Sequence, residues 1–165
     1  MIIGIDPGIS GAIAFMHDGN VTSVIDMPTT RKTTGKGLQI DAYELASLLS
    51  GYNSKTHSNI TSYRYRYTMV MVEAVSAMPN QGVSSMFSFG KSAGIIEGVL
   101  AANRLQYSFV RPQQWKKMFG LSGKDKDASR ELCIRDHPEI AHRLQRKKDH
   151  GRAEAILIAK FGERQ

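Results

Sequence analysis

The sequence predicts an α/β fold in which a mixed central sheet, three antiparallel strands followed by parallel strands, is flanked by helices. Three short apolar runs open the chain, "MIIGIDPG", "SGAIAFMHDG" and "VTSVIDMP", and Gly, Pro and Asp-Gly separate them. This punctuation is typical of an antiparallel meander. The later segments alternate between helical and strand patterns, which favours parallel strands joined by helical crossovers.

The remaining elements follow from local patterns in chain order. The polar "TTRKTTGKG" predicts a mobile loop, and residues 52–66 predict a surface loop because they contain few aliphatic side chains. The β-rich runs "YTMVMVEAV" and "QYSFV" predict two further strands. The first predicted helix begins at Asp41 as its N-cap and stops at Gly51. The four predicted helices are residues 41–51, 84–104, 125–136 and 149–160.

Length and composition limit the class of protein. A chain of 165 residues with 41% hydrophobic and 22% charged residues predicts one soluble globular domain spanning residues 1–165. No run approaches the roughly 18 apolar residues needed to cross a bilayer, so we expect no membrane association. Cys133 is the only cysteine, which excludes an intrachain disulfide and suits a reducing compartment. We therefore expect a cytoplasmic protein of a bacterial or phage-infected cell, without a targeting peptide or a small-molecule cofactor.

The charge balance favours a polyanionic partner. Lys and Arg number 22 against 15 Asp and Glu, for a formal charge of +7. Much of the excess lies between residues 111 and 152, where a surface could follow a phosphate backbone. Charge alone leaves open that the protein binds nothing in particular. The basic candidates for DNA contact are Lys116, Lys117, Lys124, Lys147, Lys148 and Arg152.

Three carboxylates stand where apolar elements should not hold them. Asp6 ends the first strand, Glu73 ends "TMVMVE", and Glu154 lies within the apolar "AEAILIA". Asp6 alone is better explained as a turn residue before Pro7-Gly8. Convergent carboxylates need a cation to offset their repulsion, and Mg²⁺ with oxygen ligands is the usual solution. Beside a basic surface, this predicts phosphodiester hydrolysis with two metal ions per site.

"GIDPGISGAIAF", the strand-end acid of "MVMVEAV" and "KKDHGRAEAILIA" together resemble the RuvC family of Holliday-junction resolvases, above all its phage and chloroplast branches. The resemblance spans nearly the whole chain. It implies a ribonuclease-H-like fold, a homodimer, and Mg²⁺-dependent paired nicking of four-way DNA junctions, with Mn²⁺ able to substitute. It also implies that Asp6, Glu73 and Glu154 bind the metal, and that a lysine in the region of Lys124 and Lys126 lies close to the scissile phosphate. We choose Lys126, because it opens the following helix.

One position departs from the family pattern. Many members carry a second acid three residues before the helix acid, where this chain has Gly151. The fourth ligand is then His150 or Asp149, or is missing. Positions 150 and 154 differ by roughly 40° on a helix, whereas 149 and 154 differ by roughly 140°. We therefore predict His150 as the catalytic and metal-binding partner, and Asp149 as the helix cap.

Other motifs have a binding interpretation and a packing interpretation. Residues 78–90 predict a loop that inserts at the junction centre, through stacking and base-edge contacts. Its candidates are Met78, Asn80, Gln81 and Phe87, although Phe87 and Phe89 could instead anchor the following helix. Lys124 and Lys126 could equally be a solvated helix start. Trp115 is interpreted as a core anchor and Cys133 as inert packing. Gly90, Gly94 and Gly98 share one helix face, which would allow close approach to a partner subunit or to the sheet.

Three other function classes are weighed against a junction endonuclease. An actin-like ATPase is disfavoured because that fold needs a second related domain, and 165 residues without a repeat leave no room for one. A non-catalytic DNA-binding module would keep the basic surface without needing three misplaced acids. A ribonuclease that cleaves RNA/DNA hybrids on the same fold is the closest competitor. Cleavage-sequence preference, and activity on flaps or forks, do not follow from the sequence.

Overall fold

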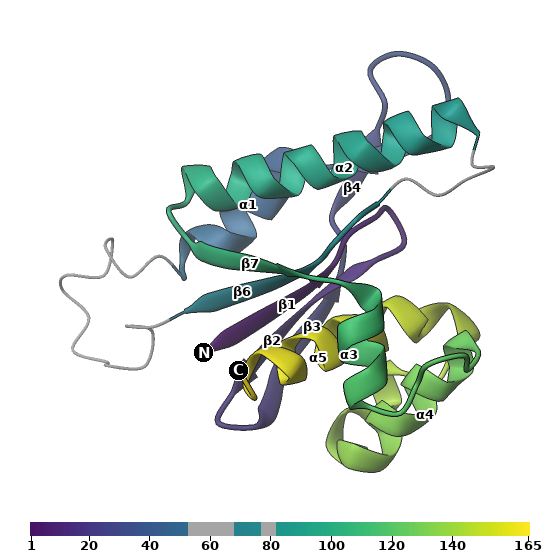
Figure 1. Ribbon diagram of the computed structural model, residues 1–165. Helices are drawn as coiled ribbons and strands as arrows, with labels where there is room; N and C mark the ends of the chain where they lie inside the picture. Colours follow the sequence, from purple (N-terminus) through teal and green to yellow (C-terminus); the bar gives the residue numbers. More distant parts are fainter. Residues whose placement is uncertain (53–67, 77–81) are drawn as a thin grey trace, which may run out of the picture.

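The computed structural model describes residues 1–52, 68–76 and 82–165. A five-stranded sheet with strand order β3-β2-β1-β6-β7 forms its centre (Figure 1). The strands β1, β2 and β3 are antiparallel, and β6 and β7 run parallel to β1. The sheet strands are β1 (Ile2–Asp6), β2 (Ala12–His17), β3 (Asn20–Asp26), β6 (Met69–Glu73) and β7 (Gln106–Val110). The predicted mixed sheet is confirmed.

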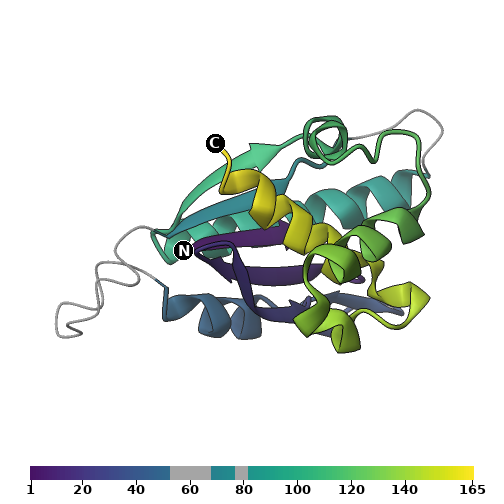
Figure 2. The ribbon, with the colours of Figure 1, turned by 90° about the horizontal axis from the view of Figure 1, so that it is seen from below.

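Helices cover both faces of this sheet. One face carries α1 and α2, and the other carries α5 with α3 and α4 beside it (Figures 1 and 2). Two short 3₁₀ turns, Pro138–Arg143 and Lys147–Asp149, lead from α4 into α5. The helices are α1 (Ala42–Ser50), α2 (Val83–Ala102), α3 (Pro112–Met118), α4 (Lys126–Asp136) and α5 (His150–Gly162).

Large and small residues alternate along the central strand β1, so the two faces of the sheet differ in how closely helices can pack on them. Successive residues of a strand face opposite sides of the sheet. Ile3 and Ile5 of β1 are buried in the core cluster beneath α1 and α2, whereas Gly4 between them faces α5. A Cβ on Gly4 would collide with the main chain of α5 at Ala155 and Ala159. The small residues on this face therefore let α5 lie directly on the sheet.

The β4–β5 hairpin and the helix α3 were not predicted from the sequence. The expected mobile loop at residues 29–37 instead forms the first strand and the turn of a hairpin, whose two strands of three residues are β4 (Thr29–Arg31) and β5 (Leu38–Ile40). Gly35 and Gly37 take positive φ at its turn, which suits glycine. Strands this short leave no detectable alternation. The helix α3 was also missed, because its seven residues are too few for a helical period to emerge from the sequence.

The predicted caps and packing residues can be compared directly with the structure. Asp41 caps α1 by accepting from the backbone N–H groups of Tyr43 and Glu44, as predicted. Cys133 is fully buried, and burial raises the pKa of its thiol to about 12. Such a thiol stays protonated and unreactive at neutral pH, which confirms the packing role. Within the described ranges, every helix is too short or too polar to cross a bilayer.

Candidate active site

Asp6 and Glu73 lie side by side at the carboxyl ends of two neighbouring parallel strands. The register pairs Ile5 of β1 with Val72 of β6, and each acid is the next residue on its strand. Both carboxylates are half-buried. In open α/β sheets, this edge is where binding sites form. The two strand-end acids predicted from the sequence are therefore brought together by strand pairing alone.

Glu154 reaches the same region from α5. The start of this helix packs against the end of β1, and a Cβ built on Gly151 would lie 3.1 Å from Asp6 Oδ2. Glu154 follows Gly151 by three residues, so it lies on roughly the same side of the helix one turn later. Its side chain is only 12% exposed. The acid that looked misplaced in an apolar helix thus points toward the strand-end acids.

The helix α3 contributes a partner for each of the two glutamates. Trp115 is fully buried, and its indole Nε1–H donates to Glu73 Oε2 over 2.8 Å. Lys116 Nζ lies 3.7 Å from Glu154 Oε1 and 5.1 Å from the centre of the Trp115 ring. The predicted core position of Trp115 is confirmed. Its contact with Glu73 was missed, because a Trp followed by two lysines does not by itself indicate a carboxylate partner.

The electrostatics of Glu73 reflect a crowded acidic site. Burial raises the pKa of Glu73, and the nearby negative charge of Glu154 raises it further. The hydrogen bond from Trp115 and the positive charge of Lys116 act in the opposite direction. The net pKa lies above the ordinary value. Two carboxylates therefore share one ammonium group in a poorly solvated place, where an added cation would be stabilised.

The three acids supply the oxygen ligands that a hard divalent cation prefers, but their side chains do not converge into a ligand set. Mg²⁺ and Mn²⁺ prefer carboxylate oxygens, which Asp6, Glu73 and Glu154 supply. Among residues 1–52, 68–76 and 82–165, however, no three His, Cys, Asp or Glu side chains converge tightly enough to form a ligand set. In the present arrangement Trp115 holds Glu73 and Lys116 holds Glu154. Binding of a metal would require Glu154 to exchange its ammonium partner for the ion.

Gly151 explains the departure from the family pattern. A Cβ at this position would stand 2.6 Å from the carbonyl oxygen of Ser10 and 3.3 Å from Gly11 Cα. The first distance is shorter than real Cβ contacts, and the atom it meets belongs to the backbone. The position that carries an acid in many family members therefore has no room for any side chain in this chain.

Asp149 does not cap α5, and the prediction that it does is wrong. The helix has no side-chain cap hydrogen bond from Asp149. Its buried carboxylate instead accepts from the backbone N–H of Arg146 at 2.9 Å and from the Arg146 guanidinium at 2.7 Å. The Arg146 hydrogen bonds lower the pKa of Asp149. The cap failed because the preceding residues form a 3₁₀ turn, which directs the carboxylate back to Arg146.

His150 opens α5 and is partly buried. One ring nitrogen, Nδ1, lies 3.1 Å from the carbonyl oxygen of Lys147. A backbone contact of this kind orients the imidazole and fixes its tautomer, as it does for many histidine ligands. Because Asp149 is engaged by Arg146, His150 keeps its place as the predicted fourth ligand.

The predicted DNA-contact residues are exposed, outside the described residues, or engaged by an acid. Lys117, Lys124, Lys147 and Lys148 are exposed, and so is Phe87, with 75% of its surface accessible. The core-anchor interpretation of Phe87 is therefore wrong. Met78, Asn80 and Gln81 lie outside the described residues, and of Lys126 only its place as the first residue of α4 is described.

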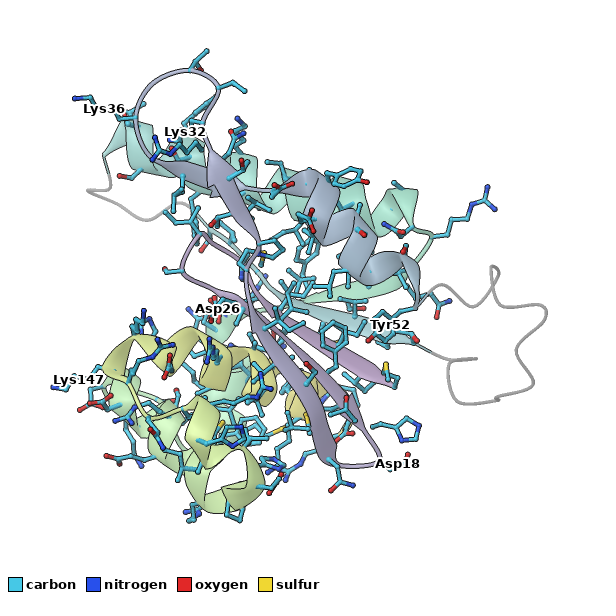
Figure 3. All side chains as sticks on the ribbon, turned by 180° about the vertical axis from the view of Figure 1, so that it is seen from behind. Asp18, Asp26, Lys32, Lys36, Tyr52 and Lys147 are labelled. Atoms are coloured by element: carbon cyan, nitrogen blue, oxygen red, sulfur yellow. The ribbon has the colours of Figure 1, made fainter. Side chains whose placement is uncertain are left out.

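Arg152, like Lys116, is a basic candidate that an acid engages. Its guanidinium forms two short hydrogen bonds with Asp26 at the end of β3, at 2.6 and 2.7 Å, and a third with the carbonyl oxygen of Arg143 at 3.0 Å. Figure 3 shows Asp26 facing the start of α5. Only 18% of the Arg152 side chain is exposed. The assignment of Arg152 to DNA contact is corrected, because its donors are already used to fasten α5 to the sheet.

No protein-family model matches the chain. A curated relative, the chloroplastic Holliday junction resolvase MOC1 of Chlamydomonas reinhardtii, is 35% identical over 89 residues. The match covers 53% of this chain and 10% of the relative, so the chain spans about a tenth of that protein's length. The relative is a chloroplast protein, which contradicts the expectation of a cytoplasmic location. Composition and cysteine content do not distinguish these two reducing compartments.

Two solved structures are similar over nearly the entire chain. The RuvC structure from Thermus thermophilus matches with a TM-score of 0.53 at 15% identity, covering 99% of this chain and 95% of that one. Thermus thermophilus RuvC in complex with a Holliday junction substrate matches with a TM-score of 0.55 at 16% identity, covering 99% and 94%. These matches establish the fold. The chain has the fold of RuvC, and its predicted resemblance to the RuvC family of Holliday-junction resolvases is confirmed.

Proposed function

We propose that this chain is a structure-selective DNA endonuclease that resolves four-way junctions by metal-dependent, paired phosphodiester hydrolysis. The observation that carries the proposal is the meeting of Asp6, Glu73 and Glu154 at one edge of a RuvC-like sheet. A solved relative of this fold is a complex of RuvC with a Holliday junction substrate. The curated relative is also named as a Holliday junction resolvase.

Asp6, Glu73, His150 and Glu154 would hold the metal, which we propose to be two Mg²⁺ ions, with Mn²⁺ as a substitute. When bound, the metal supplies an activated water and stabilises the leaving oxygen. Lys116 balances the charge of Glu154 before metal arrives, and is then free to face a phosphate. The proposed role of Lys126 is to stabilise charge that develops on the scissile phosphate.

The DNA-binding surface consists of exposed lysines from three segments. Lys117 lies on α3, Lys124 precedes α4, and Lys147 and Lys148 form the 3₁₀ turn before α5. These segments cover the same side of the sheet as α5 (Figure 2). Each phosphate contact should contribute a slope of about −0.9 to log affinity against log salt. A salt-independent affinity for junction DNA would contradict this surface.

We propose a homodimer, because symmetric cuts in a four-way junction require two equivalent sites. Gly90, Gly94 and Gly98 lie exposed on α2, and a Cβ at any of them would meet nothing within 4 Å in the described protein. These glycines therefore do not serve packing against the sheet, which leaves contact with a second subunit as their proposed role. Sedimentation should show a dimer at micromolar concentration, and Gly94→Leu should dissociate it.

The direct test is cleavage of a synthetic immobile four-way junction in Mg²⁺, beside a linear duplex and an RNA/DNA hybrid. Asp6→Asn, Glu73→Gln and Glu154→Gln should each abolish nicking and retain junction binding, because phosphate contacts supply the affinity. Glu44→Gln on α1 is the matched control, since it makes the same chemical change on the opposite face of the sheet. Preferential cleavage of the hybrid would instead support a ribonuclease.

A further inference from the structure

A groove of about 530 Å³ lies outside the acidic site, between the β4–β5 hairpin and the N-terminal half of α2. The hairpin wall includes Lys32 and Leu38, the helix wall includes Phe87 and Lys91, and Ile9 of the β1–β2 turn lines one end. This volume is within the range of pockets that hold small ligands. None of Asp6, Glu73 and Glu154 lines this groove.

The lining combines exposed apolar surface with positive charge. Phe87 is 75% exposed, Ile9 50% and Leu38 45%, so three large apolar side chains face solvent around one groove. Its charged lining residues are Lys32 and Lys91, and no acid lines it within the described protein. An exposed aromatic ring flanked by ammonium groups suits a flat base attached to a phosphate. Hydroxyl groups of Ser84 and Ser88 also line the groove and can bond base edges.

The groove begins next to the strand-end acids. Gly8 and Ile9 line it and follow Asp6 by two and three residues, a span of at most about 11 Å. The Phe89 ring reaches within 3.8 Å of the Cβ position of Gly8, so the β1–β2 turn packs on α2 at this end. A DNA strand placed with a phosphate at Asp6 would therefore have its neighbouring nucleotide close to the groove.

We propose that this groove binds one unpaired nucleotide of the DNA strand that is cut, with its base against Phe87 and its phosphate between Lys32 and Lys91. Lys91 Nζ donates to Gln39 Oε1 on β5 over 2.9 Å, which holds its ammonium group between helix and hairpin. The inference rests on the proposed function. It assigns to the β4–β5 hairpin the role of a second wall that separates an unpaired base from duplex DNA.

The first test measures binding of a fluorescently labelled hexathymidylate by anisotropy. Phe87→Ala should weaken binding by about five- to a hundredfold, because stacking of a base on an aromatic ring has an energy of this size. Tyr43→Ala is the matched control, since Tyr43 is a 79% exposed aromatic residue on α1 outside the groove. It should stay within twofold of the wild type. Equal binding by both variants would overturn the proposal.

The second test compares two lysines of the same hairpin. Lys32 lines the groove, whereas Lys36 does not line it and lies at the exposed tip (Figure 3). Lys32→Gln should reduce the slope of log affinity against log salt by about 0.7, the value for one phosphate contact on a single strand. Lys36→Gln removes the same charge and should leave the slope unchanged. An equal loss in both would indicate general electrostatic attraction and overturn the site.

Junction cleavage by the wild-type protein separates this inference from the proposed function. If oligonucleotide binding depends on Phe87 and Lys32 but no junction is cut, the groove stands as a nucleotide site and the proposed function fails. If junctions are cut while neither substitution changes oligonucleotide binding or the cleavage rate, the groove assignment fails alone. Thermal melting of each variant verifies that it is folded, which is expected because the substituted side chains are wholly or partly exposed.

Discussion

Replacing Gly151 by alanine tests whether the start of α5 must lie against the end of β1. The added methyl group would stand 2.6 Å from the carbonyl oxygen of Ser10 and 3.1 Å from Asp6 Oδ2. The Ser10 oxygen belongs to the backbone and cannot rotate away. The Gly151→Ala protein must therefore move either the helix or the β1–β2 turn by several tenths of an ångström, and Asp6 lies between them.

The expected loss is larger in catalysis than in stability. Overpacking costs about 1–3 kcal/mol, and the higher helix propensity of alanine offsets about 1 kcal/mol of that. The net destabilisation of roughly 0–2 kcal/mol corresponds to a Tm lower by at most about 8 °C in a chain of this length. Misplacement by 1 Å can cost about a hundredfold in rate, so we expect single-turnover junction cleavage in Mg²⁺ to fall by roughly tenfold or more.

Gly51→Ala is the control for this prediction, because it adds the same methyl group at the end of α1, where φ is −68° and nothing lies within 4 Å. It should raise stability by about 0.4–1 kcal/mol and leave cleavage unchanged. A Gly151→Ala protein with both the Tm and the cleavage rate of the wild type would refute the reasoning about the close approach of α5.

Three further outcomes follow from contacts around the site. Trp115→Phe keeps an aromatic ring but removes the N–H that holds Glu73. The cleavage rate should fall about tenfold, which is the effect of one lost hydrogen bond of about 1.4 kcal/mol. A higher Mg²⁺ concentration should also be needed for half-maximal cleavage. Because the pKa of the Glu73 carboxyl is raised, the folded protein binds a proton there more tightly than the unfolded chain does. The wild type should therefore lose stability relative to Glu73→Gln as the pH rises from near 4.5 through the folded-state pKa. Urea melts at a series of pH values measure this loss. Arg152→Gln should lower the Tm by several degrees and leave junction affinity unchanged, whereas an unchanged Tm with weaker binding would restore its DNA-contact role.

The layers of the fold were predictable because they depend on local periodicity. The apolar runs of β1 and β2 and the helical spacing of α1 are each readable within a window of a few residues. The β4–β5 hairpin was not predictable in this way. Its two strands have three residues each, too few to show alternation, and its pairing depends on the glycine turn at 35 and 37.

The acids of the candidate site were predictable because a charged residue stands out in an apolar segment. The partners of these acids were not predictable. Glu73 and Glu154 stand out as charges in apolar segments, and this signal is local. The partner of Glu73, Trp115, is 42 residues away in sequence, and the partner of Arg152, Asp26, is 126 residues away. Sequence reasoning therefore assigned Arg152 to DNA by its charge alone, since the carboxylate that engages it is visible only in the fold.

The packing of α5 and the position of Glu154 have one common cause. Gly4 of β1 and the alanines of β2 present small side chains to α5, which lets the helix axis lie close to the sheet. Glu154 projects from the same helix, so the depth at which α5 packs also sets how near its carboxylate comes to Asp6 and Glu73. Substitutions on the sheet-facing side of α5 should therefore alter stability and, under the proposed function, metal affinity together. Those on its far side, such as Lys160, which pairs with Asp136 at 2.9 Å, should alter stability alone.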